Sequence, residues 1–83
     1  MAVRSPPHAR ERTGEHGATE DEVRAAVEQG EQFRAKFGRT GFRRNFPFDS
    51  EWRGKHYRTK QLEAYSVREG PDSLVITIIT RYF

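Results

Sequence analysis

The feature that most constrains the fold of this chain is a change of hydrophobic period at Gly30. Before it, Val23, Ala26 and Val27 recur at the i, i+3, i+4 spacing of a helix with one buried stripe. After it, apolar and polar residues alternate, which is typical of strands with one covered face. Helical segments followed only by strand segments predict an α+β architecture, with the helices packed on one face of a sheet.

Two N-terminal helices are predicted, within about residues 6–30. Thr19 and Glu22 have the spacing of a capping box, in which the hydroxyl and the carboxylate each satisfy a free backbone N–H group at the helix start. The serine and prolines of residues 5–7 predict the start of a shorter helix over about residues 8–15.

The rest of the chain, about residues 31–82, is predicted to form a sheet. Four strands are expected, over about residues 33–37, 42–48, 56–68 and 74–80. Because the connections between them are short, they favour an antiparallel meander. Tyr57 and Leu62 fall on different parities of the third strand, which predicts a bulge or bend between them. The alternation in the first strand predicts that Phe33 and Phe37 share a core face.

Positive charge is concentrated in the middle of the chain, where residues 32–60 hold nine basic and two acidic side chains. Aromatic residues alternate with these cations, and this combination is typical of surfaces that bind phosphates and unpaired bases. The same cations could simply be the solvent-exposed face of the strands, and an acidic protein partner would also suit their positive field. The expected nucleic-acid contacts are Arg34, Lys36, Arg43, Arg44, Lys55 and Arg58.

The composition narrows the chemistry. The chain has no cysteine and no paired histidine motif, so we expect no metal and no cofactor, and a reducing, cytoplasmic location. The sequence has no long apolar run and no apolar N-terminal stretch, so we expect neither a membrane span nor a secretory signal.

Two short segments carry a family resemblance. The run Pro7-His8-Ala9, with Arg12, precedes a Glu-x-Gly-Ala-Thr segment that ends at Thr19, and the chain ends in Thr80-Arg81-Tyr82-Phe83. This layout resembles a family of small bacterial domains related to the BrnT and RelE/ParE-like toxins of toxin–antitoxin systems. The resemblance implies a RelE-like fold for the single α+β domain of residues 1–83. The two N-terminal helices would pack on an antiparallel sheet of about four strands.

The resemblance also implies a function, that of a metal-independent ribonuclease with an acidic antitoxin partner, acting on RNA or on the ribosome. By position it carries over His8, Arg12, Arg81 and Tyr82, while residue chemistry adds His56 and Lys60. His8 or His56 would be the base that activates the ribose 2′-OH. The cations would hold the phosphate, and Tyr82 would orient it or stack on a base.

Two other functions fit the same residues. One is a non-catalytic nucleic-acid-binding or ribosome-associated module, and the other is a protein-interaction domain with a basic face. Convergence of His8, Arg81 and Tyr82 around one phosphate would favour the ribonuclease. Dispersed histidines beside a stripe of arginine and lysine would favour the binding module.

Overall fold

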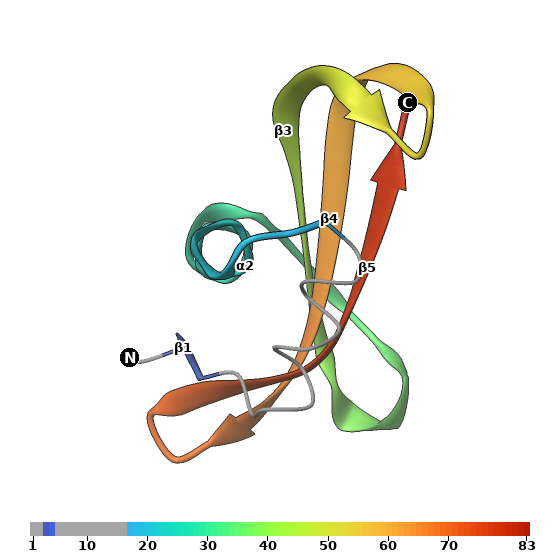
Figure 1. Ribbon diagram of the computed structural model, residues 1–83. Coiled ribbons are helices and arrows are strands. Elements are labelled where there is room, and N and C mark those ends of the chain that lie inside the picture. The colour runs from blue at the N-terminus through green and yellow to red at the C-terminus, as the bar shows by residue number, and fades with distance from the viewer. Residues whose placement is uncertain (1–2, 5–16) are drawn as a thin grey trace.

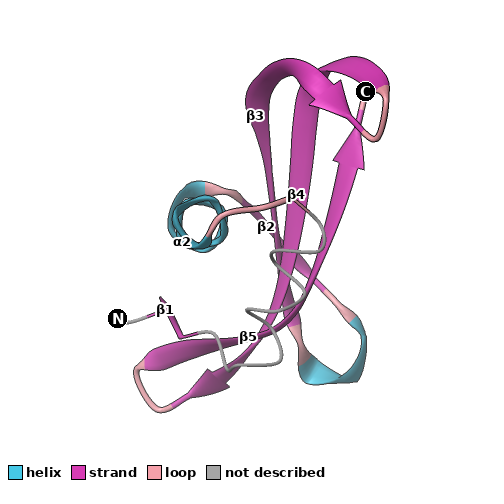
Figure 2. Ribbon diagram, in the orientation of Figure 1, coloured by secondary structure: helices cyan, strands magenta, loops and turns pink. Residues whose placement is uncertain are grey.

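The structure is a computed structural model that describes residues 3–4 and 17–83 (Figure 1). Its elements are β1 (Val3–Arg4), α2 (Glu20–Gln29), β2 (Glu31–Arg34), the 3₁₀ turn η1 (Lys36–Gly38), β3 (Thr40–Trp52), β4 (Lys55–Glu69) and β5 (Asp72–Tyr82). Strands dominate, and α2 lies across one side of the long, curved β3–β4–β5 sheet (Figure 2). Within the described residues, no helix is long and apolar enough to span a membrane.

Helix α2 begins and ends where the sequence predicts. Thr19 and Glu22 form the capping box: the Glu22 N–H donates to the Thr19 hydroxyl at 3.1 Å, and the Thr19 N–H donates to the Glu22 carboxylate at 2.9 Å. The helix ends at Gly30. The predicted stripe of Val23, Ala26 and Val27 is buried.

The sheet has five strands in the order β1-β5-β4-β3-β2. Strands β2 to β5 form an antiparallel meander, as predicted, and β1 adds a two-residue parallel pairing with β5. The register shifts in two places, between Pro47 and Ser50 in β3 and between Tyr65 and Ser66 of β4 where it meets β5. The first shift lies opposite residues 57–59 of β4, within the span where a bulge or bend is predicted, and the extra residues themselves lie in β3 and β5.

Alternation along the strands gives the sheet two different faces. The side that packs against α2, here called the helix face, holds the apolar core: Phe42, Leu62, Ala64, Val75 and Ile78, together with the stripe of α2 and Ala18. The opposite side, here called the open face, holds Arg43, Glu63 and Arg81 among others, because successive side chains of a strand point to opposite faces.

The predicted fold class needs correction. The described residues contain one α-helix and a mixed five-stranded sheet, where two helices on a purely antiparallel sheet of about four strands were expected. The first predicted helix, over 8–15, lies outside the described residues. The missed strand is β1, and a pairing of two residues carries no readable alternation.

The prediction of a core position for Phe37 is also wrong. β2 ends at Arg34, and Phe37 lies in the turn η1 with a left-handed backbone (φ 61°) and 86% of its surface exposed. The alternation that includes Phe33 therefore stops before Phe37.

Candidate nucleic-acid interface

A buried carboxylate organises the centre of the open face. Glu63 of β4 is only 3% exposed, and its cross-strand partner in β3 is Arg43. Arg43 donates to Glu63 Oε2 from Nη2 at 2.8 Å and from Nε at 3.2 Å. Arg81 of β5 approaches the other oxygen, with 3.6 Å between its Nη2 and Glu63 Oε1. One carboxylate therefore faces two guanidinium groups.

The charge of Arg43 is reinforced by its neighbours. The hydrogen bond with Glu63 is the main cause that raises the pKa of Arg43, and the negative charges of Glu63 and Glu31 act in the same direction. Arg43 stays a cation at every physiological pH. Its side chain is 37% exposed, and that of Arg81 is 61% exposed, so both reach solvent.

Next to this cluster lies an aromatic step. Phe33 of β2 is the cross-strand partner of Gly41, and a Cβ atom on Gly41 would come within 2.3 Å of the Phe33 ring. Glycine therefore lets the ring lie close against the sheet. The Phe33 ring meets Tyr65 edge to face with 5.9 Å between centroids, and the Arg43 guanidinium lies 4.7 Å from the Phe33 centroid. The aromatic step is thus in contact with the arginine cluster.

The aromatic step forms one wall of a shallow groove of about 450 Å³. The groove runs to the turn η1, and its lining includes Phe33, Tyr65, Phe37, Arg34, Lys36 and Arg39. Phe37 projects into solvent, and the Arg39 guanidinium lies 5.8 Å from its ring centroid. Three cations and three aromatic rings therefore line one groove, and among the described residues no acidic side chain does.

The predicted nucleic-acid contacts divide between three places. Arg34 and Lys36 line the groove, and Arg43 contacts the aromatic step beside it. Arg44 lies apart, on the parity of the helix face, where it donates to Gln29 of α2 and stacks on Phe46.

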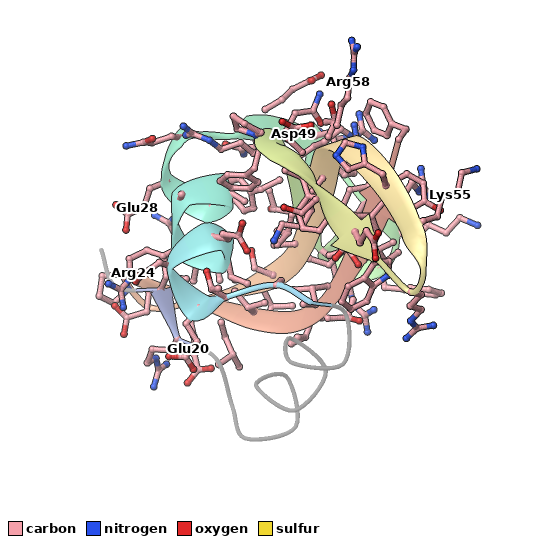
Figure 3. All side chains as sticks on the ribbon, turned by 45° about the horizontal axis from the view of Figure 1, so that its top comes forward. Glu20, Arg24, Glu28, Asp49, Lys55 and Arg58 are labelled. Atoms are coloured by element: carbon pink, nitrogen blue, oxygen red, sulfur yellow. The ribbon has the colours of Figure 1, made fainter. Side chains whose placement is uncertain are left out.

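The other two predicted contacts, Lys55 and Arg58, lie at the β3–β4 hairpin and project outward (Figure 3). In the ribbon view this hairpin is at the opposite end of the sheet from the β2–β3 turn that carries Phe37 (Figure 1). Cations that are close together in the sequence are therefore far apart in the fold.

The predicted catalytic residues are also separated. Lys60 and Tyr82 are cross-strand partners on the helix face, whereas Arg81 points to the open face. His56 lies at the β3–β4 hairpin, 3.1 Å from Asp49 between Nε2 and Oδ1. His8 and Arg12 lie outside the described residues. Of the four described candidates, only Lys60 and Tyr82 come together.

Lys60 has a structural partner. Its Nζ donates to Glu22 Oε1 at 2.8 Å and to the Gly17 carbonyl oxygen at 3.1 Å, and the side chain is 7% exposed. These bonds hold the ammonium between the start of α2 and the sheet. A lysine held in this way stabilises helix docking, and little of it is accessible to a substrate phosphate.

Tyr82 belongs to an aromatic cluster. Its ring stacks on Trp52 at 5.0 Å and also contacts Phe48 and Tyr57. Burial is the main cause that raises the pKa of Tyr82 above its ordinary value, so the phenol is protonated at neutral pH. A Cβ atom on Gly17 would come within 2.6 Å of the Tyr82 hydroxyl and 2.5 Å of Trp52, so the chain packs closely against both rings there.

Sequence reasoning missed five residues of this surface: Glu63, Phe33, Phe37, Arg39 and Tyr65. Glu63, Arg43 and Arg81 all occupy open-face positions of their strands, and this was the available signal. The alternation of residues does not specify the strand register that brings the three together. Arg39 had been assigned to a turn, and Phe37 to the core.

No family model, curated protein or solved structure matches the chain. The part of the chain that the structure describes also holds no group of three or more histidine or carboxylate side chains arranged to bind a metal.

Proposed function

We propose that this protein is a binding module for single-stranded RNA and that the RNA lies along the open face. The observation that supports this best is the groove beside η1, where the described lining gathers three cations and three aromatic rings and contains no acidic side chain. Cations attract the phosphate backbone, and exposed rings stack on bases that have no pairing partner.

The chemistry of the groove favours single strands over a duplex. In a duplex the bases already stack on one another, so rings such as Phe37 and Tyr65 have no base face to contact. A flexible single strand can turn a base onto each ring while its phosphates reach Arg34, Lys36 and Arg39. We therefore expect weak preference among base sequences and a strong dependence on salt.

Fluorescence anisotropy with a short labelled single-stranded RNA tests this proposal. Phe37→Ala is expected to weaken binding about fivefold or more, because stacking on one aromatic side chain contributes about 1–3 kcal/mol per base. Arg39→Gln is expected to weaken binding as well and to reduce its salt dependence. Arg24→Gln is the matched control, since Arg24 is an exposed arginine of α2 (Figure 3) and changes the net charge equally.

Absence of binding at low salt, or equal affinities for Phe37→Ala, Arg39→Gln and the control, would contradict the proposal. Tight binding of an acidic protein with no binding of RNA would assign the same surface to a protein partner, which is the alternative that the charge pattern leaves open.

Endoribonuclease activity is the second candidate, and the position of Tyr82 favours it. His8 and Arg12 lie outside the described residues, and Gly17, where the longer described part of the chain begins, packs closely against the Tyr82 hydroxyl. The Tyr82 phenol, which also shares a hydrogen bond with the Thr80 side chain, is protonated and would donate to a phosphate or a leaving oxygen. Membership in the toxin-related family, with an acidic antitoxin partner, stays a prediction.

Incubation of RNA with the purified protein and a chelator tests the second candidate. Attack by the substrate's own 2′-OH would leave a cyclic phosphate or 3′-phosphate end and would spare DNA. Tyr82→Phe is expected to lower such cleavage with RNA binding unchanged. If the RNA stays intact with and without ribosomes, under conditions where binding is measured, the ribonuclease hypothesis fails and only the binding module remains.

A further inference from the structure

We propose that Arg43 and Arg81 form a clamp for one phosphodiester group on the open face, and that Glu63 is the positioning residue that holds both arginines in place. This inference rests on the proposed RNA-binding function and names the part of the ligand that the centre of the face takes. The phosphate would be the backbone group next to the base that stacks in the groove.

The two guanidinium groups come from different strands and meet at one carboxylate. Arg43 of β3 uses Nε and Nη2 on Glu63 Oε2, and Arg81 of β5 reaches Oε1 at 3.6 Å. Each arginine has five N–H donors, so each keeps donors beyond those that Glu63 occupies. A phosphate has oxygens for both arginines, and paired arginines are a common geometry for binding it.

A purely structural ion pair would need only one cation. Glu63 is 3% exposed, and a buried carboxylate requires a partner, which Arg43 supplies at 2.8 Å. Arg81 adds a second positive charge at a longer distance, and its side chain is 61% exposed. An exposed arginine at this distance gains little stability from the contact. Because its guanidinium is exposed and only loosely held, Arg81 is available to an anion that approaches from solvent.

Direct side-chain contacts connect the clamp to the groove. The Arg43 guanidinium stacks on Phe33, and Phe33 and Tyr65 line the groove. Ile79, the cross-strand partner of Glu63, lines it too. A strand of RNA whose base stacks beside Phe33 would thus place its adjacent phosphate next to Arg43 and Arg81.

Glu63→Gln gives the sharpest test, because simple electrostatics and the clamp predict opposite results. The substitution removes a negative charge from the face, which by charge alone would strengthen RNA binding. If Glu63 positions the two arginines, the same substitution weakens binding, by about threefold or more if one arginine is freed. Tighter binding by this variant would overturn the positioning role.

The arginines are tested separately from Glu63. Arg43→Gln and Arg81→Gln are each expected to weaken RNA binding about fivefold and to lower the slope of log affinity against log salt by about 0.7, the value for one phosphate contact of a single strand. Arg24→Gln in α2 is the control of equal charge change. An effect of Arg81→Gln no larger than that of the control would contradict the clamp.

A titration with inorganic tripolyphosphate separates the clamp from the proposed function. The signals of the arginine Nε–H groups are followed by NMR. Those of Arg43 and Arg81 are expected to shift together in the parent protein, and that of Arg43 is expected to stay unchanged in the Arg81→Gln variant. Shifts at the clamp without any RNA binding would overturn the proposed function and keep the phosphate site. RNA binding with no shift of these signals would overturn the phosphate site and keep the proposed function. Melting temperatures of all variants establish that each is folded.

Discussion

Phe37 combines two features that a residue serving only the fold does not need. It has a left-handed backbone with φ of 61°, which costs a non-glycine residue roughly 1–3 kcal/mol, and it exposes 86% of its surface. The next residue, Gly38, also has a positive φ, so the turn places two such residues in sequence. An exposed ring on a strained backbone, at the rim of a basic groove, is consistent with selection for binding.

The first prediction concerns this residue. Phe37→Gly should raise the free energy of unfolding by about 1 kcal/mol, because glycine adopts the left-handed region without the steric cost of a Cβ atom. The same variant should weaken RNA binding about as much as Phe37→Ala does. Thermal and denaturant unfolding measure the first effect, and anisotropy the second. A variant that is less stable than the parent would contradict the argument that the left-handed backbone of Phe37 is strained.

At the scale of elements, the start of α2 is tied to the sheet by the same carboxylate that caps the helix. Glu22 Oε1 accepts from the Thr19 N–H at 2.9 Å and from Lys60 Nζ at 2.8 Å. Lys60 also holds the carbonyl of Gly17. Capping and docking are therefore coupled, and the ion pair is largely shielded from water because Lys60 is 7% exposed.

The second prediction is that Thr19→Ala lowers the free energy of unfolding by about 0.5–2 kcal/mol, since it leaves the Glu22 N–H without its cap. Thr19→Ser keeps the hydroxyl and is the control, with an expected loss well below that of alanine. Chemical denaturation monitored by circular dichroism measures both. Equal stability of the alanine and serine variants would contradict the role of the hydroxyl.

Much of the element order was predictable from sequence. The helix bounds followed from a capping box and a glycine, and the four longer strands followed from alternation. The ends of strands were less accessible, because β3 continues through Pro47 to Trp52 with a positive φ at Asp49 that no pattern announces. β1 was out of reach, since its two residues are ordered only by their pairing with β5.

The residue types of the candidate site were predictable from the sequence, and their positions were predictable only in part. The basic and aromatic character was legible in residues 32–60, but the grouping of the cations depends on register and curvature. The sequence did contain one signal that was missed: Arg81 and Tyr82 are neighbours in a strand, so they point to opposite faces and cannot share one phosphate.

At the scale of the whole molecule, the cations of the groove lie far from those of the β3–β4 hairpin. The described molecule extends 41 Å along its longest axis. The β2–β3 turn, whose residues line the groove, and the β3–β4 hairpin, which carries Lys55 and Arg58, lie at opposite ends of the sheet (Figure 1). The range of an exposed charge is set by salt, with a Debye length of about 8 Å at 0.15 M and about 30 Å at 0.01 M ionic strength. The hairpin cations are therefore screened from the groove at physiological salt and act on it at low salt.

The third prediction follows from this geometry and concerns the double variant Lys55→Gln/Arg58→Gln. Its affinity for a short RNA should stay within about twofold of the parent at 0.15 M salt, whereas at 0.01 M it should be clearly lower because the long-range field of both ends then adds. Arg34→Gln/Lys36→Gln makes the same charge change in the groove and should weaken binding at both salt concentrations. An equal loss for the two double variants at 0.15 M would move the RNA-binding surface to the hairpin or extend it over both ends.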